Sequence, residues 1–352
     1  MRIDKNCPLC NEYVELKYSG LPGYKEPQKF NIYHCPFCDT SYSFPKVDPD
    51  SIYDLIYRNG AIAPGYHRYW ELSEDIKRVK DPLEYLTKKE MTYWAASKAV
   101  HEYTLKIRDP KILEVGSGLG YLTYAFRTAG FNITGLEISK TAVKIAKEKY
   151  GDFYISGDLF KYSKENEGVY DIVLLTEVIE HVEDITSFIS ALSKLIKPDG
   201  QLIITTPNKY FYPDDTIWVS DLPPVHLWWL SEKSVKCIAG KLNLKVSFID
   251  FTDFYRNNYT PMRIDVNKKI SRRHPVFNSN GELIKSQKKN VFEKTLSELV
   301  CILNEVDIFK ICYKNLRQLY LKLTFYKNPN IKSCGRQTHI LCAVLKKNNI
   351  LS

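Results

Sequence analysis

The stretch KILEVGSGLGYLTYAFRTAGFNITGLEIS, residues 111–139, constrains the fold of this chain more than any other feature. It contains an apolar run, a turn with three glycines, a segment with helical spacing of apolar side chains, and a second apolar run that ends in Glu137. This order is typical of a Rossmann-type unit, in which glycines let the backbone approach a ligand and the closing acid binds ribose hydroxyls. We therefore expect an α/β fold that binds a nucleoside-containing ligand.

The glycine spacing and a second acid narrow the choice of ligand. Gly116, Gly118 and Gly120 follow the pattern Gly-x-Gly-x-Gly, whereas the dinucleotide fingerprint is Gly-x-Gly-x-x-Gly. Glu114 stands on the first strand, just before the turn. A carboxylate at this point suits a ligand that has an ammonium group and no pyrophosphate, which favours S-adenosylmethionine over NAD.

At these residues the chain resembles class I S-adenosylmethionine-dependent methyltransferases, over about residues 111–251. The resemblance implies a Rossmann-like seven-stranded sheet, with residues 244–251 and 338–347 as a final antiparallel pair. It also implies that Glu114 and the glycine turn hold the methionine portion of the cofactor, that Glu137 holds the ribose, and that residues 138 and 158 contact the adenine. The implied cofactor-binding residues are Glu114, Gly116, Ser117, Gly118, Gly120, Glu137, Ile138, Asp158, Leu159 and Thr176.

Two cysteine pairs precede this core. CPLC holds Cys7 and Cys10, and after 24 further residues CPFC holds Cys35 and Cys38. Each pair lies on a tight turn that aims two sulfurs at one point, and four thiolates satisfy tetrahedral Zn²⁺. With strand-like runs between the pairs, the pattern predicts a zinc ribbon whose closed site serves folding or docking. The alternative is four unrelated buried cysteines.

The segment LLTEVIEHV, residues 174–182, places three candidate functional groups where the fourth core strand ends. On a helix beginning there, Glu177 and His181 would share a face and Glu180 would lie beside it. The segment resembles the EVxEH motif of ubiquinone-biosynthesis O-methyltransferases and of small-RNA 3′-terminal 2′-O-methyltransferases, in which these residue types bind a divalent metal. His226, in PPVHLWW, lies where the RNA enzymes have a second histidine. The resemblance implies Mg²⁺ or Mn²⁺ on these four residues.

Three roles for this motif are open at the level of sequence. A bound metal would lower the pKa of an acceptor hydroxyl and fix its oxygen against the methyl group. His181 or His226 could instead remove the hydroxyl proton as a general base without metal. The third is a structural or cofactor-side role.

The charge of the chain is concentrated in its last third. The 352 residues have a formal net charge of +9, and residues 256–352 contain 19 Lys and Arg against 6 Asp and Glu. This asymmetry indicates an anionic partner or a solvated lysine-rich surface. Apolar spacing over residues 292–306 and 316–323 predicts two helices in an insertion between the last two strands, which would form a lid, an anion-binding platform or an oligomer contact.

The predicted organisation has five segments. Residues 51–108 are expected to be helices that cover the edge of the sheet, with aromatic and basic side chains at 66–70 that suit a substrate mouth or packing. The segments are a zinc ribbon (1–50), this helical cover (51–108), the methyltransferase core (109–252), a basic helical insertion (253–336) and the final strand with a tail (337–352). The remaining cysteines lack ligand spacing and are expected to be buried or incidental: Cys237, Cys301, Cys312, Cys334 and Cys342.

Ribbon and core together, over about residues 7–255, resemble bacterial methyltransferases associated with surface-polysaccharide, sugar or natural-product biosynthesis. The resemblance implies O-methylation of an anionic sugar, glycan or other hydroxyl acceptor, although the long insertion departs from that group. The alternatives are a 2′-O-methyltransferase that acts on a terminal ribose of RNA, and a non-catalytic adaptor. Without an apolar run of about 18 residues or an apolar leader, we expect a cytoplasmic protein with no transmembrane segment.

Overall fold

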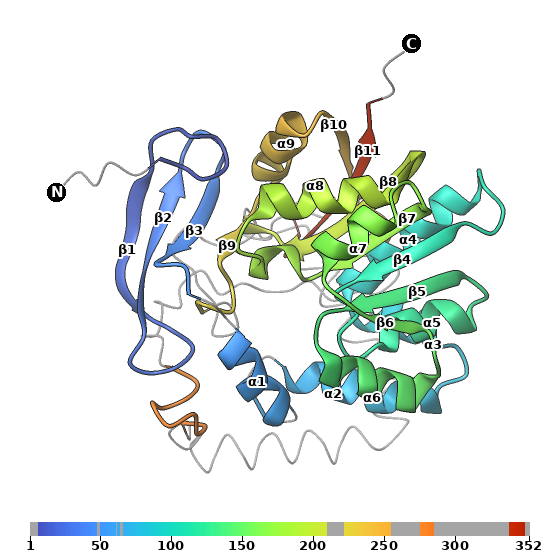
Figure 1. The fold of residues 1–352 in the computed structure, drawn as a ribbon, viewed down its shortest axis with the longest axis horizontal. Coiled ribbons are helices and arrows are strands. Elements are labelled where there is room, and N and C mark those ends of the chain that lie inside the picture. Colours follow the sequence, from blue (N-terminus) through green and yellow to red (C-terminus); the bar gives the residue numbers. More distant parts are fainter. Residues whose placement is uncertain are drawn as a thin grey trace, which may run out of the picture.

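A computed structural model describes residues 6–47, 50–60, 62–63, 66–209, 222–254, 275–284 and 338–348 of the chain (Figure 1). The described residues form a seven-stranded sheet with helices on both faces and, beside it, a four-stranded antiparallel sheet built mainly from the N-terminal segment with the cysteines. The predicted fold class, an α/β methyltransferase sheet with an additional N-terminal ribbon, is confirmed.

The large sheet has the strand order β10-β11-β8-β7-β4-β5-β6. Its strands are β4 (Lys111–Val115), β5 (Asn132–Glu137), β6 (Tyr154–Ser156), β7 (Tyr170–Thr176), β8 (Ile196–Pro207), β10 (Leu244–Phe248) and β11 (Ile340–Lys347). The central strand β7 is buried along almost its whole length, as expected for a strand with helices on both faces. β11 runs antiparallel to both β8 and β10, which confirms the predicted final pair.

The helices after the central strands begin at side-chain caps close to the strand ends. Ser139, Asp158 and Asp184 accept hydrogen bonds from the first free N–H groups of α6, α7 and α8. The short connections bring these helix starts to the carboxyl edge of the sheet, where ligands bind in open α/β folds. The helices of this part are α5 (Tyr121–Thr128), α6 (Lys140–Tyr150), α7 (Leu159–Glu165), α8 (Ile185–Leu195) and α9 (Glu232–Lys241).

The helices that precede the core are α1 (Asp50–Arg58), α2 (His67–Asp75), α3 (Pro82–Lys89) and α4 (Met91–Thr104). We expected this region to cover the edge of the sheet, but α4 packs against β7, β8 and β11, on a face of the sheet. Ala95, Ala96 and Ala99 of α4 are buried, and their small side chains allow this close approach. The expectation of an edge cover was therefore wrong for α4.

The small sheet has the order β1-β2-β3-β9. The ribbon supplies β1 (Glu15–Pro22), β2 (Lys29–Cys35) and β3 (Thr40–Phe44), whereas β9 (Trp228–Trp229) comes from the chain between β8 and α9. One buried cluster also contains Leu9 and Tyr42 of the ribbon together with Val173 and Trp228. The ribbon thus shares a hydrophobic core with the large sheet.

Most of the predicted insertion lies outside the described residues, including both predicted helices and Cys301, Cys312 and Cys334. Its longer described part, residues 275–284, is a turn in which Phe277 bridges to Lys25 of the ribbon and to Leu283. The limits of the five segments stay a prediction. Within the described part of the chain, no helix has the length and apolar character needed to cross a membrane.

Candidate active site

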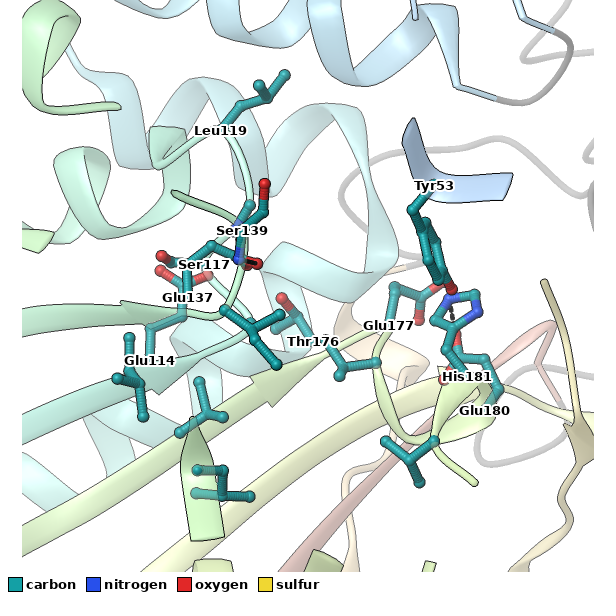
Figure 2. A pocket seen from close by; sticks show the side chains of 18 of the residues that line it. Tyr53, Glu114, Ser117, Leu119, Glu137, Ser139, Thr176, Glu177, Glu180 and His181 are labelled. Carbon is teal, nitrogen blue, oxygen red and sulfur yellow. Dashed lines mark hydrogen bonds and ion pairs between the residues drawn. The ribbon is translucent and has the colours of Figure 1, made fainter. Parts of the chain in front are cut away.

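A cavity of about 1070 Å³ opens at the carboxyl edge of the large sheet, between the ends of β4, β5 and β7 and the helices α1 and α2 (Figure 2). Its lining divides into two groups of residues. We name the first group the cofactor half after its predicted role, and it comprises Glu114, Gly116, Ser117, Gly118, Glu137, Ile138, Asp158 and Leu159. We name the second group the acceptor half on the same basis, and it includes Tyr53, Arg68, Glu177, Glu180, His181 and His226. Thr176 lies between the two halves in Figure 2.

The glycine turn requires backbone that other residues rarely adopt. Gly116 and Gly118 have φ angles of +73° and +50°. A Cβ atom on Gly116 would lie 2.6 Å from Val178 Cγ2, so the turn packs tightly against the end of β7. At Gly118 a Cβ atom would meet nothing within 4 Å, although the residue lines the cavity, so the space beside it is open to a ligand.

Nine of the ten predicted cofactor residues line the cavity, and Gly120 is the exception. A Cβ atom on Gly120 would lie 2.6 Å from Ala146, so this glycine is needed where the turn packs on α6. The spacing in the sequence could not separate a glycine that faces a ligand from one that faces a helix.

Glu137 is fixed by two backbone groups. Its carboxylate accepts hydrogen bonds from the amides of Gly118 and Ser139, each at 2.8 Å. These bonds join the glycine turn to the end of β5 and orient the carboxylate toward the cavity. Nearby, the Ser117 hydroxyl is buried without a hydrogen-bond partner, as expected for a group that awaits a ligand.

Glu114 is buried and accepts a hydrogen bond from the Thr123 hydroxyl. Burial raises the pKa of Glu114 to about 8, and the bond from Thr123 opposes this shift. A ligand ammonium group beside Glu114 would stabilise its ionised form. The buried acid, the unpaired Ser117 hydroxyl and the oriented Glu137 carboxylate together fit the ammonium and ribose groups of S-adenosylmethionine.

The backbone after β7 does not form the predicted helix. Glu177 has a φ of +54°, in the left-handed region, and its amide donates to the Thr205 carbonyl of β8 at 3.1 Å. A single 3₁₀ turn, Ile179–His181, follows before α8 begins. The prediction that Glu177 and His181 share a helix face was wrong, because the bond to β8 turns the chain sharply.

Glu180, His181 and His226 come together in the acceptor half. One potential ligand atom from each lies within 4.8 Å of the others, and the two imidazole centroids are 4.6 Å apart with perpendicular rings. Glu177, the fourth predicted ligand, is not part of this group. Its Oε1 atom is buried without a hydrogen-bond partner, and its pKa is raised by burial and by Glu180.

The hydrogen bonds of His181 determine which nitrogen carries a proton. Nδ1 lies 2.6 Å from the Val225 carbonyl, which can only accept, so Nδ1–H is the donor and Nε2 holds the lone pair in the neutral ring. Nε2 is 3.7 Å from Glu180 Oε1, too far for a direct hydrogen bond. Thr206 donates to the other Glu180 oxygen at 2.9 Å. The separation of Nε2 and Oε1 thus suits a cation bound to both atoms.

His226 is held in a turn between residues 222 and 227. Its amide donates to the Leu222 carbonyl at 3.3 Å, and the next amide, of Leu227, donates to the Glu180 carbonyl at 2.9 Å. Burial, followed by the charges of His181 and Arg68, lowers the pKa of His226 well below its usual value. This shift favours the neutral ring, which can bind a metal.

Aromatic side chains complete the acceptor half. The aromatic and basic residues at positions 66–70, which the sequence assigns either to a substrate mouth or to packing, line the cavity: Tyr66, Arg68, Tyr69 and Trp70. Four tyrosines were missed: Tyr53, Tyr57, Tyr93 and Tyr121. Figure 2 shows the first of them beside His181, with ring centroids 6.1 Å apart and edge to face. Their local sequence pattern is that of any buried helix, so nothing in it marks them as cavity residues.

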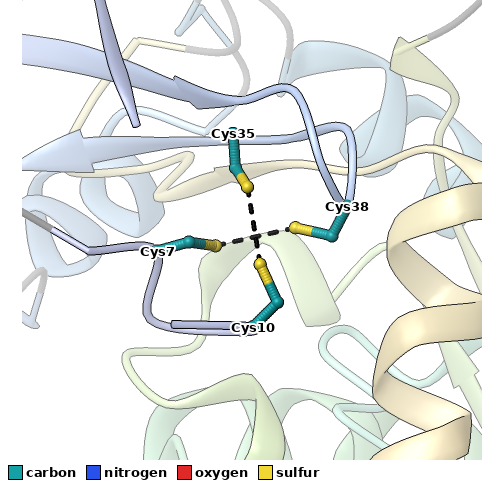
Figure 3. A group of neighbouring side chains, drawn as sticks. All are labelled: Cys7, Cys10, Cys35 and Cys38. Atoms are coloured by element: carbon teal, nitrogen blue, oxygen red, sulfur yellow. Dashed lines mark hydrogen bonds between the residues drawn. The ribbon is translucent and has the colours of Figure 1, made fainter. Parts of the chain in front are cut away.

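The four predicted cysteines form a second group, away from the cavity (Figure 3). Cys7 and Cys38 sulfurs are 3.6 Å apart, and Cys10 and Cys35 sulfurs are 3.4 Å apart. These distances exclude disulfides, whose sulfurs lie about 2.05 Å apart. They are close to the edge of about 3.8 Å that follows from Zn–S bonds of about 2.3 Å in a tetrahedron. Cys38 Sγ also donates a hydrogen bond to the Thr40 hydroxyl at 3.2 Å. The group therefore fits Zn²⁺.

Comparison with known proteins identifies the core. Residues 74–247 match the family model described as a methyltransferase domain. The ubiquinone biosynthesis O-methyltransferase of Vibrio atlanticus is 31% identical over 149 residues, which are 41% of this chain and 59% of that protein. The enzyme of the same name from Aromatoleum aromaticum is 26% identical over 152 residues, with the same coverage. The chain thus spans about three fifths of the length of the curated relatives it matches.

Solved structures give weaker matches. A methyltransferase from Archaeoglobus fulgidus, described as dependent on S-adenosylmethionine, is 16% identical, with coverage of 79% of this chain and 100% of that one and a TM-score of 0.42. Another, from Aquifex aeolicus, is 20% identical, with 44% and 82% coverage and a TM-score of 0.34. At these scores neither adds to what the family model indicates. By the family match, residues 74–247 belong to a methyltransferase domain, and β11 completes its seven-stranded sheet.

Proposed function

We propose that this protein transfers the methyl group of S-adenosylmethionine to a hydroxyl oxygen of a sugar, polysaccharide or related small molecule. The observation that carries the proposal is the group Glu180, His181 and His226, which lines the same cavity as the cofactor half. The names of the curated relatives, which are O-methyltransferases, support oxygen as the acceptor atom.

The cofactor half would hold S-adenosylmethionine through complementary groups. Glu114 would pair with the ammonium group, and Glu137 would accept hydrogen bonds from the ribose hydroxyls. Ile138 is 72% exposed on the cavity lining, so an adenine ring that packed on it would cover apolar surface. Asp158 would accept from the adenine amino group. When bound, the cofactor supplies a methyl group activated by its sulfonium.

The acceptor hydroxyl must lose its proton, because a neutral sugar hydroxyl is a poor nucleophile. His181 Nε2 is the proposed base, since Nδ1–H donates to the Val225 carbonyl and Nε2 therefore carries the lone pair of the neutral ring. The acceptor oxygen forms a bond to the methyl carbon while the carbon–sulfur bond breaks, and the proton moves to Nε2. Glu180 would then stabilise the imidazolium at a distance of 3.7 Å.

The same three residues could hold a divalent metal. Two imidazoles and one carboxylate suit Mn²⁺ better than Mg²⁺, which prefers oxygen ligands. When bound, the ion would lower the pKa of the acceptor hydroxyl. Glu180 Oε1, His181 Nε2 and a His226 nitrogen would be its ligands, and we propose Glu177 as a group that binds the acceptor beside them.

The test is methyl transfer from labelled S-adenosylmethionine to a panel of glycans, nucleotide sugars and short RNAs. We expect labelled glycan or nucleotide sugar, and a loss of 10²–10⁴-fold in kcat for His181→Gln, the range for removal of a general acid or base. His101→Gln, an exposed histidine on α4, is the matched control. Transfer that survives His181→Gln unchanged would exclude both roles of this residue.

Metal dependence is read from the same assay. EDTA treatment followed by Mg²⁺ or Mn²⁺ distinguishes a metal site from a metal-free base, provided that the zinc content is measured before and after by elemental analysis. Activity that falls with EDTA while the zinc content stays constant, and that returns with Mn²⁺, would assign the metal role to the acceptor half. Activity that does not change with EDTA would favour His181 as a general base without metal.

A second candidate is methylation of a terminal ribose of RNA. It is favoured by the surplus of positive charge over residues 256–352, because a polyanion would be attracted to it. Label transferred to the RNA members of the panel, and not to the glycans, would select it. Absence of both transfer and cofactor binding would favour a non-catalytic adaptor.

A further inference from the structure

We propose that the cysteine ribbon positions His226, so that the ribbon is a structural part of the acceptor half. The inference rests on the proposed function only in giving His226 a role in methyl transfer. Its basis is β9, the two-residue strand that begins two positions after His226 and belongs to the ribbon sheet.

Backbone bonds tie both sides of His226 to the ribbon. Before it, the Tyr24 amide donates to the Pro223 carbonyl at 2.7 Å. After it, the Ser43 amide donates to the Leu227 carbonyl at 3.0 Å, and Trp228 pairs with Tyr42 across the β3–β9 ladder. A shift of β3 would therefore move the turn that carries His226.

Trp228 links the ribbon to the other histidine as well. Its ring is 1% exposed and lies with its centroid 5.8 Å from that of Tyr42. Its indole N–H donates to the Val182 carbonyl at 2.7 Å, one residue after His181. Both imidazoles thus depend on an aromatic contact with β3.

The turn beside Cys38 is bound to the core by contacts of Asp39, which we call the clamp. The next residue, Asp39, forms an ion pair with Lys209, and the lysine also donates to the Asp39 carbonyl at 3.2 Å. The Ser234 hydroxyl of α9 donates to the same carbonyl at 3.1 Å. Zinc held by the cysteines would fix this turn, and the turn would fix β3, which follows directly.

The cofactor half has a separate support. Its residues follow β4, β5 and β6, and Glu137 bonds to Gly118 and Ser139 within that unit. Loosening the ribbon should therefore disturb the acceptor half and leave cofactor binding intact. A general loss of stability would disturb both.

Lys209→Met, which removes the clamp without touching a cysteine, tests the proposal. The readouts are amide hydrogen exchange followed by mass spectrometry and calorimetric binding of S-adenosylhomocysteine, neither of which requires a known acceptor. We expect exchange over residues 222–230 to rise at least tenfold, exchange over residues 112–122 to stay constant, and the dissociation constant to change less than twofold. Chelation of the zinc should give the same pattern, and restored zinc should reverse it.

Lys197→Met is the matched control, since it breaks the ion pair with Asp171 at the opposite end of β7. Asp39→Asn serves if Lys209→Met fails to fold, because asparagine tolerates the φ of +56° at this position. Unchanged exchange over residues 222–230 in Lys209→Met or Asp39→Asn, or an equal rise over residues 112–122, would overturn the proposal. If the expected pattern appears but no acceptor is methylated, the positioning holds and the proposed function fails.

Discussion

At the scale of single residues, the proposed role of Glu114 predicts that cofactor affinity depends on pH. Its pKa of about 8 means that the free site is mostly protonated at neutral pH, whereas an ammonium ligand binds the ionised form. Affinity for S-adenosylhomocysteine should therefore rise roughly tenfold per pH unit between pH 6 and pH 7.5 and level off above 8, with release of a proton. Calorimetry in buffers of different ionisation enthalpy measures both effects.

Glu114→Gln is the control for this prediction, because glutamine keeps the shape of the side chain and does not titrate. The variant should bind weakly and with little change between pH 6 and 8. If the wild-type chain showed a flat profile and released no proton, Glu114 would not be the group that pairs with the ammonium.

The residues of the cofactor half could be predicted because their signals are local. Glu114, Glu137 and Asp158 each follow or end a strand that the sequence pattern marks, and the glycine turn lies beside them. Glu177 could not be placed in this way, since its left-handed conformation depends on the bond to Thr205 of β8. Tyr53 could not be identified either, because only the folded chain brings α1 to His181.

At the scale of elements, the ribbon should depend on its metal. Cys35→Ala removes a buried sulfur from the four-cysteine group and leaves three ligands. We expect zinc content to fall below half of the wild-type value and the unfolding free energy to drop by more than about 4 kcal/mol, as for loss of a structural metal. Elemental analysis and denaturant unfolding measure these changes.

Cys342→Ala is the matched comparison, because this cysteine is equally buried but lies on β11, outside the cysteine group. It should keep its zinc and lose only about 1 kcal/mol, through a small cavity. Equal losses in the two variants would mean that Cys35 acts by packing alone and that the group holds no structural metal.

The large elements of the fold were predictable, and the contacts between modules were not. The spacing of the two cysteine pairs predicts the ribbon, and the spacing of the apolar runs predicts the strands and helices of the core. The final strand pair follows from the number of strands that the family resemblance implies. β9 has two residues and no strand pattern of its own. It becomes a strand only because β3 offers an unpaired edge, which is a property of the assembled molecule.

At the scale of the whole molecule, the charge of the last third should govern binding of polyanions. If residues 256–352 engage RNA phosphates, the logarithm of affinity should fall with the logarithm of salt concentration with a slope of about −0.7 per phosphate contacted. Fluorescence anisotropy with a short labelled RNA between 50 and 300 mM salt measures it. Lys268→Gln with Lys269→Gln should reduce the slope by about 1.4.

The paired control is Lys88→Gln with Lys89→Gln, two exposed lysines at the end of α3. It removes the same charge from a segment outside the last third and should leave the slope unchanged. An equal reduction in both double variants would mean that RNA responds to net charge alone, without a binding surface in the last third.

The two halves of the cavity also differ in the point during synthesis at which each half can fold. The cofactor half comes from one continuous stretch, residues 114–159, whose strands β4, β5 and β6 are neighbours in the sheet. Val225, next to His226, belongs to a buried cluster with Tyr24, Ile52 and Phe277, which come from segments far apart in the chain. Local contacts form faster than distant ones. A growing chain could therefore shape its cofactor site early in synthesis, and the acceptor site would be the last part of the cavity to mature.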